Sequence, residues 1–147
     1  MLNNLLIEVE SNRVIRVPLF ENCDLEELLD MRDDEEFDSE WMRVYDALNE
    51  FEIGDFEKKK IDNIREKSFL KSYNLSGLGD IASCVSDDFE IICKAYLTNY
   101  NDMWVNSLIM SYVNGKFPCG RLEKTEYDIT DIAAADVSRQ GVLLDGH

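Results

Sequence analysis

The chain has 147 residues, of which 45% are hydrophobic, so it is long enough and apolar enough to bury one core. Its formal net charge of -16 at pH 7 repels nucleic-acid backbones and anionic membranes and attracts cationic proteins. No apolar run approaches the ~20 residues that span a bilayer. The first residues, MLNNLLIEVES, have neither the positive region nor the long apolar region of a secretion signal, so we expect a cytoplasmic protein.

The pattern of residues 5–20 predicts a small β-hairpin. Ile7 and Val9 alternate with glutamates, and the run 14–17 is rich in β-branched residues, as in many strands. Asn12 supplies the turn between them, because asparagine tolerates the positive φ angle that tight hairpin turns require. A lone hairpin is marginal in water, so we expect this one to pack on helices or to gain a strand from a partner.

The rest of the chain reads mainly as helices. Apolar periodicity and capping residues predict them over 24–29, 38–52, 55–73, 80–85, 87–99 and 102–114. Asp24 is expected to cap the first of these helices and Asn101-Asp102 the last. The interval 32–38 has little to bury and is expected to be irregular. Ser86-Asp87-Asp88 looks like the start of the helix over 87–99, which is the most apolar part of the chain and should be central, covered on more than one side.

These elements predict a mainly α (α+β) protein, a single-domain helical bundle with a small N-terminal β-hairpin. The domain is expected to cover residues 1–135, followed by a C-terminal tail over 136–147. After Gly120 the pattern fits either a strand that contains Tyr127 and Ile129 or a final helix that begins near Thr130.

Little in the sequence indicates a metal site or catalysis. The cysteines, Cys23, Cys84, Cys93 and Cys119, form no CxxC pair, so we expect reduced, buried thiols and neither metal nor cofactor. The only histidine is His147, the last residue, and no glycine-rich phosphate cradle is present. We therefore expect no enzyme. A carboxylate mechanism stays open, and a pocket with two carboxylates of shifted pKa would favour it.

The most unusual stretch is the acidic run from Asp24 to Glu40, in which ten carboxylates are opposed only by Arg32. Such runs are commonly solvated helix faces or linkers, but this one also suits a cationic partner. Phe37 lies among the acids and is expected to be exposed there as an anchor, whereas Trp41 and Tyr45 fit a core stripe. The predicted partner-binding residues are Asp30, Asp33, Asp34, Glu35, Glu36, Phe37, Asp38 and Glu40.

Residues 73–120 resemble the helical part of bacterial immunity proteins, which accompany polymorphic toxins and contact-dependent growth inhibition effectors. The resemblance is carried by Ser86-Asp87-Asp88-Phe89, Asn99-Tyr100, Trp104 and the segment from Tyr112 to Gly120. It implies a cytosolic protein that binds one cognate toxin domain, commonly a nuclease, and blocks its active site or substrate groove. It does not locate the residues that bind the toxin.

Taken together, these features predict an immunity protein that neutralises a cationic toxin nuclease through the acidic run. The leading toxin class is a basic ribonuclease, for instance of the EndoU type. The alternative is an acidic adaptor or protein-interaction domain with no toxin partner, whose carboxylates only keep it soluble. Partners that bind with little dependence on salt would favour that alternative.

Overall fold

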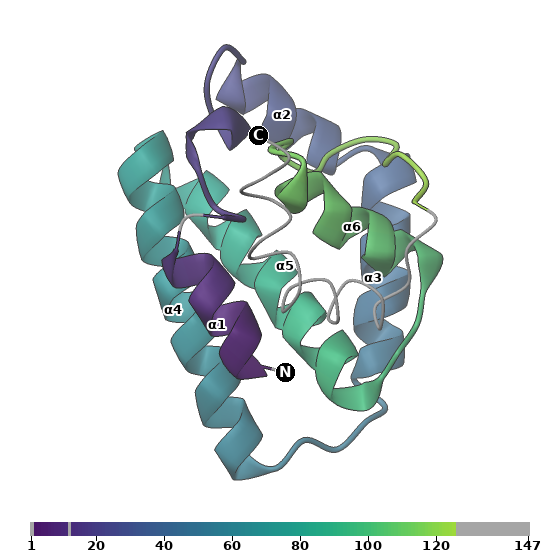
Figure 1. Ribbon diagram of the computed structural model, residues 1–147. Helices are drawn as coiled ribbons and strands as arrows, with labels where there is room; N and C mark the ends of the chain where they lie inside the picture. Colours follow the sequence, from purple (N-terminus) through teal and green to yellow (C-terminus); the bar gives the residue numbers. More distant parts are fainter. Residues whose placement is uncertain (1, 12, 126–147) are drawn as a thin grey trace.

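The computed structural model describes residues 2–11 and 13–125, which form six α-helices and one short 3-10 helix (Figure 1). The elements are α1 (Leu2–Glu10), η1 (Val17–Leu19), α2 (Leu25–Arg32), α3 (Glu35–Leu48), α4 (Asp55–Ser76), α5 (Gly79–Thr98) and α6 (Met103–Val113). The mainly helical class is confirmed, and the described residues contain no β-strand. The predicted hairpin is therefore wrong.

The other helices pack around α5, which lies in the middle of Figure 1. It contacts α1, α2, α3, α4 and α6, and its contact with the antiparallel α4 is the most extensive. Side chains are buried on most of its surface: Ile81, Ala82, Val85, Phe89, Ile91, Ile92, Cys93, Ala95 and Tyr96. A helix this apolar is stable only when it is covered on more than one side, and the prediction of a central helix is confirmed.

The helix α5 runs unbroken from Gly79 to Thr98, so the two helices expected over 80–85 and 87–99 are one. The helix start predicted at Ser86-Asp87-Asp88 is wrong. A side chain caps a helix when its oxygen accepts a hydrogen bond from a nearby backbone N–H. The carboxylate of Asp88 instead accepts hydrogen bonds from side chains of three other helices.

The first helix, α1, replaces the first predicted strand. Leu5, Glu8 and Val9 are buried at helical spacing, whereas Ile7 is 48% exposed. The carboxylate of Glu8 is stabilised by an ion pair with Arg13 at 3.3 Å. Because a buried glutamate stands where an apolar residue is expected, the alternation of Ile7 and Val9 suggested a strand that does not exist.

A loop and η1 take the place of the second predicted strand. Val14 and Ile15 are buried, so this run is apolar because it covers the core. Pro18 lies in the first turn of η1, where its missing N–H costs no hydrogen bond. Arg16 donates a hydrogen bond from Nη2 to the carbonyl oxygen of Val113 at 2.8 Å, which ties the loop to the end of α6.

The helices α2 and α3 are separated only by Asp33 and Asp34, so the irregular segment predicted over 32–38 is also wrong. Asp24 caps α2 as expected, since its side chain accepts from two backbone N–H groups of the first turn. The helix α3 begins at Glu35, three residues earlier than predicted, because Phe37 gives its first turn an apolar side chain that is buried.

A buried ion pair joins four helices. Arg32 donates from Nη1 and Nη2 to the two carboxylate oxygens of Asp88, both at 2.8 Å, and from Nη1 to the carbonyl oxygen of Pro118 at 3.1 Å. Trp41 on α3 donates to Asp88 at 3.0 Å, and Tyr112 on α6 does so at 2.6 Å. Burial opposes the charge of Arg32, but the attraction of Asp88 outweighs it and raises the pKa of the guanidinium.

The start of α6 is held by Asp102, as predicted. Its carboxylate accepts from the backbone N–H groups of Trp104 at 2.9 Å and Val105 at 3.1 Å. Arg43 on α3 bridges it to Glu40, at 2.9 and 2.8 Å. Burial alone would raise the pKa of Asp102, but these hydrogen bonds and the charge of Arg43 lower it below the ordinary value of 3.8.

Residues 126–147 lie outside the described part of the chain. The alternatives of a strand or a helix after Gly120, the domain boundary at 135 and the tail over 136–147 therefore stay predictions.

Replacing Asp88 by alanine should destabilise the protein strongly, because Arg32 then stays buried without a counter-charge. We expect the free energy of unfolding in urea to fall by about 3–5 kcal/mol. The double variant Arg32→Met/Asp88→Leu should lose less, since no uncompensated charge is buried. The matched control is Asp87→Ala on the same helix, whose side chain is 47% exposed in its ion pair with Arg65. A loss for Asp88→Ala no larger than that of this control would contradict the role given to the pair.

Two variants of Asp102 should distinguish the contribution of its helix cap to stability from that of its ion pair with Arg43. Asp102→Ala removes both and should cost about 1–2 kcal/mol at pH 7, whereas Asp102→Asn keeps the cap and should cost less. Because the folded protein lowers the pKa of Asp102, its charge stabilises the fold above the ordinary pKa of 3.8, and this contribution is lost as the pH falls through the lowered pKa. Urea unfolding of wild type and Asp102→Asn at pH 7 and pH 3 should show their difference shrinking in acid. A difference that grew in acid would refute this assignment.

Candidate partner-binding site

An open groove lies between α2, α3 and the first half of α5, with a volume of about 690 Å³. We term it the α2–α3 groove. Its walls are formed by Glu26, Leu29, Asp30, Arg32, Asp33, Phe37, Asp38, Trp41, Asp80, Ser83 and Cys84. Two consecutive helices and a third that is distant in the sequence therefore contribute to one concave surface.

The groove carries charge of one sign. Five carboxylates line it, those of Glu26, Asp30, Asp33, Asp38 and Asp80, and all five residues are exposed. Among the described residues, the one cation that lines it is the guanidinium of Arg32, whose charge is already balanced by buried Asp88. Concave surfaces lined by one sign of charge focus the electric field, so the groove attracts cations.

Both walls of the groove are held by the same buried carboxylate. Arg32 fixes the end of α2 on Asp88, and the indole N–H of Trp41 fixes α3 on it. The carboxylates of α3 then stand at the N-terminal end of that helix, where its dipole favours negative charge. Packing and helix geometry thus offset part of the repulsion within the acidic run.

Two aromatic residues, Phe37 and Trp41, line the groove. Trp41 is half-buried, and its ring stacks on that of Tyr45 with centroids 5.3 Å apart and an interplanar angle of 14°. Phe37 is only 2% exposed and packs edge-on against Trp104, so the prediction that it is exposed is wrong. The guanidinium of Arg32 lies 4.5 Å from the ring centroid of Phe37, and this cation–π contact also stabilises the buried position of the ring.

The acidic run does not form one surface. Asp30, Asp33 and Asp38 lie in the α2–α3 groove, together with the buried Phe37. Asp34 and Glu35 are exposed at the junction of α2 and α3. They line neither this groove nor the hollow on the other side of α3 that is described next.

The remaining two predicted residues face a second, more apolar hollow on the α6 side of α3. Glu36 and Glu40 line it together with Met103, Trp104 and Leu122. Glu40 is already bound to Arg43, which leaves Glu36 as the free carboxylate on that wall.

Sequence reasoning missed Asp80 as part of the groove and Asp88 as its support. Asp80 is distant in sequence from the acidic run, and nothing near it indicates a site. Asp88 did carry a signal, because it lies three residues after Val85 and four before Ile92, on an otherwise apolar helical stripe. A charged residue in such a position is usually buried and paired.

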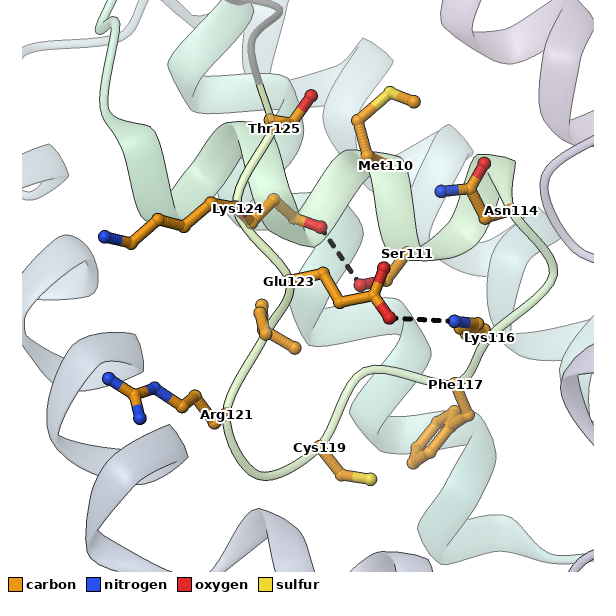
Figure 2. Close-up of a pocket in the computed structure, with 12 residues that line it drawn as sticks. Met110, Ser111, Asn114, Lys116, Phe117, Cys119, Arg121, Glu123, Lys124 and Thr125 are labelled. Carbon is orange, nitrogen blue, oxygen red and sulfur yellow. Dashed lines mark hydrogen bonds and ion pairs between the residues drawn. The ribbon is translucent and has the colours of Figure 1, made fainter.

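Another hollow lies between α6 and the segment that follows it (Figure 2). Ser107 and Ser111 are on its wall, but both hydroxyls donate to backbone carbonyls one turn earlier in α6, each at 3.0 Å. Lys116 and Glu123 pair across it at 3.0 Å, and Lys124 extends away from that pair. Both hydroxyls are therefore engaged with the backbone of their own helix, and the nearby carboxylate of Glu123 is paired with Lys116.

The four thiols are free and differ in burial. Cys93 is buried as predicted, Cys84 and Cys119 are half-buried, and Cys23 is exposed, which contradicts the expectation of burial for Cys23. Burial raises the pKa of the groove cysteine, Cys84, despite the opposing charge of Arg32, so its thiol stays protonated and weakly nucleophilic at neutral pH. Within the described residues, no cluster of three or more histidine, cysteine or acidic side chains is arranged to hold a metal ion.

Across residues 2–11 and 13–125, none of the six helices has the combined length and apolar character that crossing a membrane requires.

The model of a protein family described as "Immunity protein PIM1" matches residues 4–119, well beyond the segment 73–120 on which the resemblance rested. No curated protein matches the chain. Because the family match covers most of the sequence, this chain belongs to the immunity protein PIM1 family, and its general role is the neutralisation of a toxin.

Proposed function

We propose that this protein neutralises a cognate toxin nuclease in the cytoplasm, by placing the acidic surface around the α2–α3 groove against the cationic substrate groove of that enzyme. The family supports the neutralisation of a toxin. One observation supports a nuclease as the toxin and the groove as its binding site. Five exposed carboxylates lie on one concave surface, beside Arg32, whose charge is balanced by Asp88.

A nuclease must hold a phosphate backbone, so its substrate groove presents lysine and arginine side chains. Carboxylates that reach these side chains occupy the positions of phosphates and exclude the substrate without any chemical step. A basic ribonuclease, for instance of the EndoU type, is the toxin class that fits best. Long-range attraction between the two surfaces would also speed their association, which matters for an inhibitor that must act before its toxin does.

The concave shape matters for affinity. Ion pairs on flat, exposed surfaces contribute ~0–1 kcal/mol because water screens them. Pairs that are desolvated at the centre of an interface couple by about 1.5–7 kcal/mol. Carboxylates such as Asp38 on α3 and Asp80 on α5, which line the groove, become desolvated when a partner fills it.

The proposal is tested with the variant Asp30→Lys/Asp33→Lys and the toxin domain encoded beside this chain. Both positions are at the C-terminal end of α2, where the helix dipole favours lysine, so the fold should tolerate the change. We expect the dissociation constant from calorimetry to rise by at least about 30-fold, or roughly 2 kcal/mol. The remaining affinity should depend less on salt.

The matched control is Asp62→Lys/Glu66→Lys, which makes the same charge change at two exposed positions of α4. It should weaken binding by no more than about 3-fold, because it alters only the long-range field. Equal losses for the two variants would contradict a toxin site at the groove. A chain that neither binds nor inhibits this toxin would instead favour the adaptor alternative.

A further inference from the structure

We propose that the α2–α3 groove is a receptor for a single arginine side chain of the toxin, whose guanidinium stacks on Trp41 and is bound by the surrounding carboxylates. This inference rests on the proposed function and adds the chemical group that is recognised. It also distinguishes the groove from the rest of the acidic run, which would supply only long-range attraction.

The groove combines the two features that favour a guanidinium over an ammonium ion. An indole ring is the aromatic surface that binds cations best, and a planar guanidinium can stack on it. Asp38 lies on α3 with Trp41, whereas Asp30 and Asp80 line the groove from α2 and α5. Five N–H donors in one plane can meet carboxylates on several walls at once, which the compact ammonium group of lysine cannot do.

Trp41 is held in place before any partner arrives. Its indole N–H donates to Asp88 at 3.0 Å, and its ring is stacked on Tyr45. Asp88 is fully buried, so a partner meets the tryptophan and not the carboxylate behind it. A side chain that is already fixed loses little conformational entropy on binding, which is a property of residues that contribute most to affinity.

The same chain already binds one guanidinium in this manner. The Arg32 side chain makes a two-pronged contact with Asp88, and its guanidinium carbon lies 4.5 Å and 5.4 Å from the ring centroids of Phe37 and Phe117. Carboxylate and aromatic side chains therefore enclose an arginine just beneath the groove. The groove offers the same pair of chemical groups at the surface.

The other hollows are less suited to a cation, because each carries at least two cations of its own. Lys116, Arg121 and Lys124 line the hollow beside the end of α6, and Arg121 and Lys124 line the one beside Met103. A further hollow at the start of α4 is lined by Lys58 and Lys94 together with Glu52, Asp62 and Glu90, so its charge is largely balanced. The single cation of the α2–α3 groove, Arg32, is neutralised by its buried partner. Charge therefore selects this groove for an incoming arginine.

The first test needs no toxin. In the variant Trp104→Phe, Trp41 is the one remaining tryptophan and reports on the groove by fluorescence. Titration with N-acetyl-arginine amide should change its emission saturably, with an affinity at least about 5-fold higher than that for N-acetyl-lysine amide. The change should disappear in the background Asp38→Asn/Asp80→Asn. Equal responses to the two amides would overturn the proposal.

The second test uses the toxin domain encoded beside this chain. Asp38→Asn/Asp80→Asn should weaken its binding by at least about 10-fold. The control Glu35→Gln/Glu36→Gln removes the same charge from the first turn of α3 outside the groove, and we expect a change below about 3-fold. If the toxin binds but the two variants lose affinity equally, the arginine receptor is wrong and the proposed function survives. If the toxin does not bind at all, the proposed function fails, and the amide titration still decides the receptor.

Discussion

The ion pair between Arg32 and Asp88 is the constraint on which the arrangement of this protein depends. Burying two charges costs free energy, which is offset only when the geometry is good and the remaining hydrogen bonds are made. Here each carboxylate oxygen accepts two hydrogen bonds from side chains on three helices, and Arg32 also donates to the backbone at Pro118. The central helix is thereby joined to α2, α3 and α6 at one point.

The same pair accounts for the electrostatics of the surface. Arg32 is the one cation of the acidic run, and the structure uses it inside the protein, where it cannot neutralise the carboxylates outside. Among the residues that the structure describes, Arg32 is the only cation that lines the groove of the exposed acids, and its charge is balanced by Asp88. A surface built in this way stores repulsion that a cationic partner would relieve, which is the physical basis of the proposed toxin recognition.

The sequence predicted the helical class, the apolar central helix and the cap at Asp102, because these depend on periodicity and local hydrogen bonds. The errors share a different cause. Glu8 and Asp88 are charged residues in buried positions, and each interrupts the apolar pattern of its helix. As a result, α1 was predicted as a strand and α5 as two helices. Phe37 was expected at the surface because its neighbours are acidic, yet its ring is buried beside a guanidinium.

Part of the candidate site was predictable for the same reasons. Asp30, Asp33 and Asp38 belong to the acidic run and do line the groove. Asp80 could not be found, because only the packing of α5 against α2 and α3 brings it to the groove. That packing depends on contacts between residues that are distant in the sequence, which no local pattern encodes. Asp88 was a partial signal, because a charged residue on an apolar helical stripe is usually buried and paired with a residue of another element.

A crystal structure of this protein bound to its cognate toxin domain would test the central claim most directly. The account predicts lysine and arginine side chains of the toxin against the carboxylates of the α2–α3 groove, with the Arg32–Asp88 pair unchanged beneath them. A toxin seated instead on α4, over Lys58, Lys59 and Lys60, with the aspartates of the groove left in solvent, would contradict it.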